Sequence, residues 1–116
     1  MSNHHQIDLI EFPAESEENL QVTTRFFSDV FGWEYKDWGG VYSDTQSSGV
    51  ASGVSAAPQG KPTMPLAVVY SNNLEATKQK VIEAGGKISA DIYPFPGGRR
   101  FHFIDPSNNE LAVWSE

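Results

Sequence analysis

The 116-residue sequence contains no cysteine. Disulfide bonds, thiolate nucleophiles and cysteine-ligated metal sites are therefore excluded from any account of this chain. Its apolar runs are also short, since none approaches the roughly 20 residues that a membrane-spanning helix needs, and no signal-peptide pattern opens the chain. From these absences we expect a soluble cytoplasmic protein with no membrane partner.

Positive charge is scarce, with 8 Lys and Arg residues against 15 Asp and Glu, a formal charge of −7. Because phosphate backbones are bound by basic surfaces, this balance argues against a nucleic-acid partner. The length suits one domain, and a hydrophobic share of 39% is enough to form a single core.

The most informative stretch lies near the C-terminus, where two alternating runs flank residues 105–109, Asp-Pro-Ser-Asn-Asn. This turn chemistry between alternating runs predicts a β-hairpin. Phe101 and Phe103 fall on one face, together with Leu111 and Val113. The other face mixes ionisable groups with an aromatic ring, which is typical of a lined cavity; it carries Arg100, His102, Ile104, Glu110, Ala112 and Trp114.

Upstream patterns predict further elements. Apolar residues at three-and-four spacing indicate a helix ending before Gly32, capped by Ser16 or Asn19. Its apolar face is expected to comprise Leu20, Thr23, Phe27, Val30 and Phe31. A second helix, capped by Asn72 or Asn73, runs through Leu74, Lys78, Val81 and Ile82 and stops at Gly85-Gly86. The predicted strands span 6–12, 33–37, 40–45, 48–56, 66–70 and 87–93, with a proline-rich connector at 57–65 and a turn at 94–98.

The order strand, helix, three strands occurs twice, and Asn19-Leu20 with Gly32 recurs at a constant offset as Asn73-Leu74 with Gly86. Two units that are each too small to stand alone must bury their faces together. We therefore expect an α+β fold of two βαβββ modules, residues 6–56 and 66–116. They would form a cup-shaped mixed sheet with the helices outside and a small-molecule site in the cup.

Five sets of residues carry a resemblance to a known superfamily. They are Glu11-Phe12-Pro13-Ala14; Arg25-Phe26-Phe27 before Val30-Phe31-Gly32-Trp33-Glu34; Asn73-Leu74-Glu75-Ala76; Ala84-Gly85-Gly86-Lys87; and Phe103-Ile104-Asp105-Pro106-Ser107-Asn108-Asn109 before Leu111-Ala112-Val113-Trp114. The sequence resembles the vicinal-oxygen-chelate superfamily of glyoxalases, bleomycin-resistance proteins and extradiol dioxygenases, and within it a short glyoxalase-related branch. The resemblance implies the paired βαβββ fold and a homodimer.

Enzymes of that superfamily hold a divalent metal, commonly with one ligand from the first strand of each half and a Glu from the last strand. The resemblance places these positions at Leu9, Leu66 and Ala112, whose side chains cannot ligate a metal. Glu110 lies two residues too early for the last ligand. We therefore expect no metal site of the usual kind and no cofactor.

The resemblance and the alternation together predict the residues that line the cup: Glu11, Leu66, Val68, Tyr70, Arg100, His102, Ala112 and Trp114. Arg100 can clamp a carboxylate or phosphate, or can instead pair with Glu11 or Glu110. His102 can contact a ligand or simply form a hydrogen bond inside a wet cup. His4 and His5 are expected in a flexible, solvated tail.

The principal hypothesis is a metal-free protein that binds a small organic molecule, anionic or planar, in the cup. One alternative is a glyoxalase-like lyase or isomerase with His102 and Glu11 as catalytic residues, including metal-dependent chemistry through non-standard ligands. Another is an interaction module whose cup is closed by side chains.

Overall fold

The computed structural model describes residues 3–58 and 62–116, so the first two residues and residues 59–61 of the connector lie outside the described chain. The described elements are β1 (Ile7–Pro13), α1 (Glu17–Phe31), β2 (Tyr35–Asp37), β3 (Tyr42–Thr45), β4 (Ser52–Ser55), β5 (Leu66–Tyr70), α2 (Leu74–Glu83), β6 (Lys87–Phe95), β7 (Gly98–Ile104) and β8 (Glu110–Ser115). Within these ranges, neither helix combines the length and apolar character needed to cross a bilayer.

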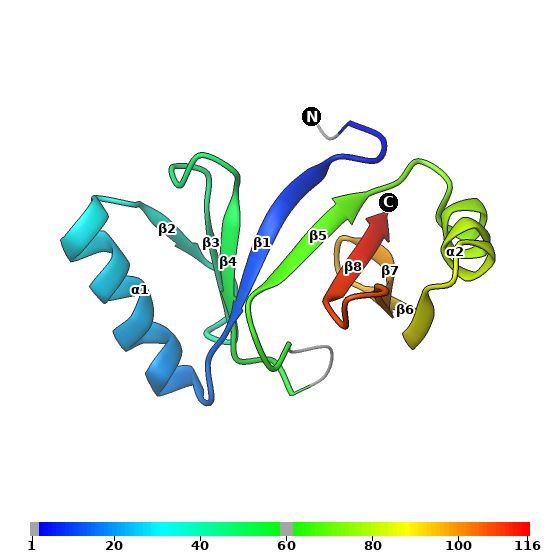
Figure 1. Cartoon of the computed structure of the whole chain (residues 1–116). Coiled ribbons are helices and arrows are strands. Elements are labelled where there is room, and N and C mark those ends of the chain that lie inside the picture. The colour runs from blue at the N-terminus through cyan, green and yellow to red at the C-terminus, as the bar shows by residue number, and fades with distance from the viewer. Residues whose placement is uncertain (1–2, 59–61) are drawn as a thin grey trace. The chain divides into compact units, whose positions relative to one another are not determined.

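The eight strands form a mixed sheet in the order β2-β3-β4-β1-β5-β8-β7-β6 (Figure 1). In the first repeat β4 pairs in parallel with β1 and antiparallel with β3, and in the second repeat β8 pairs in parallel with β5 and antiparallel with β7. The predicted α+β fold with two βαβββ repeats is therefore confirmed.

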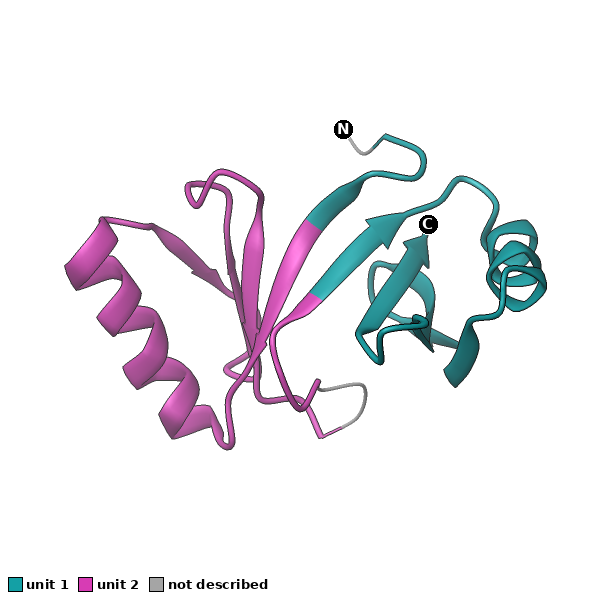
Figure 2. Cartoon of the chain, viewed as in Figure 1, with its two compact units in different colours: residues 1–8, 67–116 teal, residues 9–66 magenta. Residues whose placement is uncertain are grey.

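The chain divides into two compact units (Figure 2). Unit 1 comprises residues 1–8 and 67–116, and unit 2 comprises residues 9–66. The division falls within β1 and at the start of β5, so the two units differ from the expected modules, residues 6–56 and 66–116. The module boundaries stay a prediction.

In unit 2, α1 packs on the sheet through Leu20, which lies in a core cluster with Ala14 and Val54. The helix begins after Ser16, whose side chain accepts a hydrogen bond from the Asn19 amide at 3.0 Å. Gly32 ends it in the left-handed conformation.

The predicted apolar face of α1 was partly wrong. Val30 and Phe31 are more than half exposed, although Phe27 packs against the core as expected. Val30 lies one turn beyond Phe26 on a lateral face of the helix, so its three-and-four spacing does not direct it to the sheet.

The predicted strand over 48–56 is shorter in the structure, where β4 begins at Ser52. The Ser48 hydroxyl donates to the Val50 carbonyl at 2.7 Å, and Gly49 adopts a φ of +88°. These features form a turn that the apolar pattern does not reveal.

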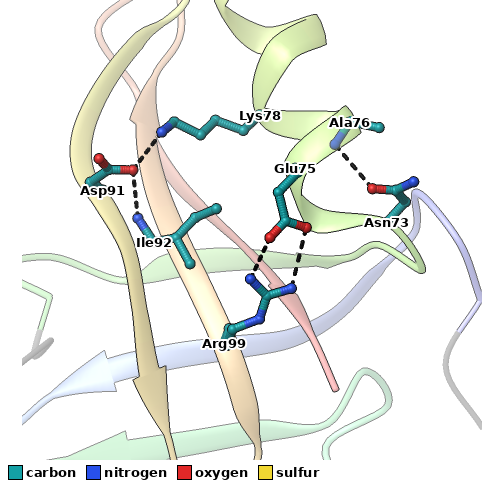
Figure 3. Close-up of polar contacts among 7 residues, drawn as sticks. All are labelled: Asn73, Glu75, Ala76, Lys78, Asp91, Ile92 and Arg99. Carbon is teal, nitrogen blue, oxygen red and sulfur yellow. Dashed lines mark hydrogen bonds and ion pairs between the residues drawn. The ribbon is translucent and has the colours of Figure 1, made fainter.

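In unit 1, α2 covers one face of the sheet through a core cluster of Leu74, Phe101 and Val113. The Asn73 side chain caps its first turn by accepting from the Ala76 amide at 3.1 Å. Two ion pairs join the helix to neighbouring strands, Glu75 with Arg99 of β7 and Lys78 with Asp91 of β6 (Figure 3). Each cation lowers the pKa of the carboxyl group beside it.

The N-terminal histidines do not form the free tail that we expected. The His4 Nδ1 atom accepts a hydrogen bond from the Asn72 amide at 3.0 Å, and the His5 ring lies 3.0 Å from the Thr77 hydroxyl. The His5 amide also donates to the Tyr70 carbonyl at 2.7 Å. Although both rings are exposed, the backbone pairing of this segment beside β5 holds them at the start of α2.

The turn between β7 and β8 is organised by Asp105, as its sequence predicts. The carboxylate accepts hydrogen bonds from the Ser107 and Asn109 amides, both at 2.8 Å, and from the Asn109 side chain at 3.0 Å. Asn108 adopts the left-handed conformation with a φ of +68°. The bonds from Asn109 and the other donors lower the pKa of Asp105.

Replacing Phe101 by Ala should lower the free energy of unfolding by about 3–5 kcal/mol, because the ring is fully buried and its loss leaves a cavity. Urea denaturation monitored by circular dichroism measures the change. Ile82→Ala removes a half-exposed side chain of α2 and should cost no more than about 0.5 kcal/mol. Equal losses for both variants would contradict the described core.

Asp105→Ala should destabilise the protein at pH 6 but much less at pH 3. Because the folded pKa of Asp105 lies below its unfolded value of about 3.9, its stabilisation is present above that value and is lost as pH falls through the folded pKa. Urea titrations at both pH values test this, with Glu15→Ala as the control for losing one exposed carboxylate. A difference from wild type that is the same at both pH values would argue against the described turn.

Candidate functional site

Strand register separates two faces of the unit 1 sheet. Phe101 pairs with Val113 and belongs to the core under α2, whereas Arg100 pairs with Trp114 and His102 with Ala112 on the opposite face. Directly paired residues project to the same side of a sheet. We call this second side the distal face; it carries Val68, Tyr70, Ala90, Tyr93, Arg100, His102, Ile104, Glu110, Ala112 and Trp114.

The pairing of β6 with β7 has two irregularities, between Ile88 and Ala90 and between Ala90 and Tyr93, and both Ala90 and Tyr93 pair with residues of the distal face. Along β6, Ala90 pairs with His102 and Tyr93 pairs with Arg100, so three steps on β6 match two steps on β7. Strict alternation would put Ala90 and Tyr93 on opposite faces, and the extra residue brings them to the same one.

The ring of His102 is 5% exposed and is held from both nitrogen atoms. Its Nε2 atom lies 2.8 Å from the Tyr93 hydroxyl and 3.2 Å from Arg100 Nε, and its Nδ1 atom lies 3.4 Å from a Glu110 carboxylate oxygen. Arginine Nε always carries a hydrogen, so His102 Nε2 accepts in that contact and is unprotonated. The ring hydrogen therefore resides on Nδ1, facing Glu110, whose Oε2 atom also accepts from the Ser89 hydroxyl at 3.0 Å.

Arg100 is the buried cation of the distal face, with 6% of the residue exposed. Its guanidinium carbon lies 5.8 Å from the ring centre of Tyr93 and 5.9 Å from that of Phe95. Both rings are half-buried, and their faces favour a cation at this distance. The adjacent Arg99 projects to the opposite side and pairs with Glu75, so two neighbouring arginines serve different faces.

Aromatic rings continue the distal face on β5 and β8. Tyr70 packs edge-on to Trp114 with ring centres 5.1 Å apart, and Phe95 lies 6.2 Å from Trp114. The Trp114 indole donates to both carboxylate oxygens of Asp8, at 3.0 and 3.1 Å. The Tyr70 hydroxyl donates to Glu116 at 2.7 Å, and that carboxylate raises the pKa of Tyr70.

Six of the eight predicted lining residues lie in unit 1 and share the distal face: Val68, Tyr70, Arg100, His102, Ala112 and Trp114. Glu11 and Leu66 lie in unit 2. The expected approach of Glu11 to His102 therefore stays a prediction.

Within unit 2, Glu11 is 5% exposed and pairs in register with Gly53 of β4. A Cβ atom on Gly53 would lie 2.3 Å from the Tyr42 hydroxyl, so the Tyr42 side chain rests directly on this glycine. The neighbouring Phe12 and Val54 belong to the core under α1. Glu11 consequently projects to the sheet face that α1 does not cover.

This chain resembles known proteins in sequence and in fold. No family model matches the sequence. A Mycobacterium bovis protein named "Putative glyoxylase CFP32" is 29% identical over an alignment of 101 positions that covers 78% of this chain and 39% of that protein. This chain thus spans about two fifths of the length of its curated relative.

Three solved structures share the fold. The Mn(II)-bound glyoxalase from Novosphingobium aromaticivorans has a TM-score of 0.67 and 16% identity, covering 99% of this chain and 40% of its own. A glyoxalase/bleomycin resistance protein/dioxygenase superfamily member from Vibrio splendidus has a TM-score of 0.66 and 18% identity, covering 93% and 97%. A methylmalonyl-CoA epimerase in complex with methylmalonyl-CoA has a TM-score of 0.62 and 13% identity, covering 98% and 96%.

This chain therefore has the fold of the glyoxalase/bleomycin-resistance/dioxygenase structures, and the predicted fold is confirmed. The curated relative supports the resemblance to that superfamily. Fold does not by itself carry the chemistry over, because activity depends on the residues of the site.

The residues of this chain do not fit the metal that the resemblance implies. Leu9, Leu66 and Ala112 offer neither an oxygen nor an imidazole nitrogen to a divalent ion. Among the described residues, no group of three or more His, Asp or Glu side chains is arranged to hold a metal. His102 and Glu110 are neighbours on the distal face, but two protein ligands fall short of the three that catalytic zinc sites commonly use.

Two contributors to the distal face were missed as site residues by sequence reasoning. Tyr93 lies on the face of β6 opposite Ile88 and Ile92, which pack against the core, and its hydroxyl lies 2.8 Å from His102 Nε2. Glu110 did share the predicted polar face, but its role in orienting His102 follows from the pairing of β7 and β8.

We predict that at neutral pH the His102 ring is the Nδ1–H tautomer. Long-range ¹⁵N–¹H NMR correlations distinguish the tautomers, with His4 and His5 assigned by substitution. Tyr93→Phe should keep this tautomer, because Arg100 still donates to Nε2. A ring protonated at Nε2 in the wild-type protein would contradict the hydrogen-bond arrangement described for the distal face.

Proposed function

We propose that this chain is a metal-free binding protein for a small organic molecule that carries an anionic group. The observation that supports this most strongly is the position of Arg100. A guanidinium is buried on the sheet face away from α2, beside a second polar group and outside the hydrophobic core. A guanidinium in such a position is suited to recognise a carboxylate or a phosphate.

The Arg100 contacts support recognition of an anion. The Nε atom donates to His102, and the planar guanidinium is a group whose geometry suits carboxylates and phosphates. The half-buried rings of Tyr93 and Phe95 lie over the guanidinium. A ligand that displaced these rings would exchange a cation–π contact for a charge-assisted hydrogen bond, which is the stronger interaction.

The neighbouring rings support an organic, planar ligand body. Phe95, Trp114 and Tyr70 form a continuous set of edge-on contacts on the distal face. The polar atoms of Trp114 and Tyr70 are already hydrogen-bonded. Their rings can therefore pack against a ligand without leaving a polar atom unpaired. His102, fixed by Glu110, would present its Nε2 edge beside the anion site.

Independence from metal is proposed because apolar side chains occupy the positions that the superfamily uses for ligands. The glyoxalase relative and the methylmalonyl-CoA complex support small-molecule binding as a superfamily property. The glyoxalase-related branch, the homodimer, the cytoplasmic location and the parts played by Glu11 and Leu66 stay predictions.

The test is a binding screen with small aromatic carboxylates and phosphates, observed by ligand NMR and quantified by calorimetry, with benzoate and neutral benzamide as a matched pair. Benzoate or an aromatic phosphate should bind, and benzamide should not. Arg100→Lys should weaken binding about 10-fold or more, because it replaces a bidentate fork by a single ammonium.

Arg99→Lys is the matched control, since Arg99 lies next in sequence but projects toward α2. It should leave the affinity unchanged, and circular dichroism should show that both variants are folded. Dialysis against EDTA should also leave the affinity unchanged. Equal binding of benzoate and benzamide, no binding of any anion, or a requirement for added Mn²⁺ would each reject the proposal.

A further inference from the structure

Unit 2 carries a cavity of about 510 Å³ along its strands β2 and β3. This volume falls within the range of about 300–1,000 Å³ that small-molecule sites usually have. The side chains that line the cavity include the exposed indole of Trp38, the half-buried carboxylate of Asp44 and the exposed Lys36. The anion site proposed above lies in unit 1 and uses none of these residues.

Strand pairing gathers these three side chains on one face of the sheet. Lys36 of β2 pairs directly with Asp44 of β3, and the Trp38 amide continues the pairing by donating to the Tyr42 carbonyl at 2.7 Å. Because Lys36 and Trp38 are two residues apart, they project to the same side. Tyr35 projects to the opposite side, where it packs against the core under α1. The three side chains therefore lie on the sheet face that α1 leaves uncovered.

The Trp38 ring is fixed in position although the residue is 51% exposed. Its Nε1 atom donates to Asp44 Oδ1 at 2.9 Å. The turn that follows is held by Asp37, whose carboxylate accepts from the Gly40 amide at 3.0 Å, and both Gly39 and Gly40 adopt positive φ values. An exposed indole held in this way can receive a ligand without first being ordered.

A cation already lies over this ring. The Lys36 Nζ atom is 4.1 Å from the centre of the Trp38 ring, and tryptophan is the aromatic side chain that attracts cations most strongly. Asp44 adds a negative charge at the edge of the same ring, and the formal charge of −7 on the chain attracts cations from solution. Because a cation–π contact of an exposed lysine contributes little, a ligand cation can displace it.

We propose that this cavity, the Trp38 cavity, binds a small organic cation of the quaternary-ammonium class, and that Lys36 competes with the ligand for the ring. The quaternary ammonium group would rest on the indole, with Asp44 as its counter-charge. Such a group is favoured over the strongly hydrated ammonium of a lysine, and a metal ion would need several oxygen ligands. With one ring as the platform, the affinity should lie in the millimolar range. The Trp38 cavity does not depend on the proposed anion site, so either proposal can fail without the other.

The test is an NMR titration of the Trp38 indole N–H signal with choline and with its neutral analogue, in which a tert-butyl group replaces the trimethylammonium group. Choline should shift the signal saturably, and the neutral analogue should not. Trp38→Leu assigns the signal and should abolish choline binding in ligand-observed NMR. Asp44→Asn retains an oxygen that can accept from Trp38 Nε1 but loses the charge, and it should weaken the affinity about threefold.

Lys36→Ala gives the sharpest result, because it should tighten choline binding about threefold by uncovering the ring. Lys80→Ala removes an exposed positive charge from α2 and is the matched control, which should leave the affinity unchanged. Arg100→Lys should also leave it unchanged, and circular dichroism should show that every variant is folded. Equal binding of choline and its neutral analogue, no saturable shift of the Trp38 signal, or a Lys36→Ala variant that binds choline no more tightly than wild type would each overturn the proposal.

Discussion

The pairing of β7 between β6 and β8 decides most of what the C-terminal unit can do. Because successive side chains of a strand project to opposite faces, the register of β7 sends Phe101 into the core under α2 and Arg100 and His102 to the distal face. A slip of one residue would exchange these sets, placing two ionisable groups under the helix. The burial of Phe101 and the polar distal face therefore depend on one register.

Two neighbouring arginines show how this register divides roles. Arg99 pairs with Glu75 at the start of α2, where the exposed ion pair helps to position the helix (Figure 3). Arg100 lies buried beside His102 and under aromatic rings. An exposed pair contributes little to stability, whereas a buried guanidinium needs partners and must be accommodated by the surrounding residues. Within the distal face these partners are the His102 ring, which accepts from Nε, and the Tyr93 and Phe95 rings, which lie over the guanidinium.

One fold can carry different chemistry, because activity depends on the residues of the site. Two βαβββ repeats are retained here, while Leu9, Leu66 and Ala112 occupy positions where the resemblance places metal ligands. On the distal face, Tyr93, His102 and Glu110 are joined by short polar contacts. Such a network fixes the orientation of one imidazole without a metal ion.

The sequence alone determined the repeat and the alternating C-terminal hairpin, and it narrowed the cap of each helix to two residues, because these features depend on local periodicity and on turn and capping chemistry. It also determined that Arg100, His102 and Trp114 share a face. Only the tertiary structure decided that Tyr93 joins them, because its contact with His102 depends on how β6 pairs with β7. Likewise, burial of α1 against the sheet selected Leu20 and Phe27 and left Val30 exposed, a choice that depends on which side of the helix meets the sheet.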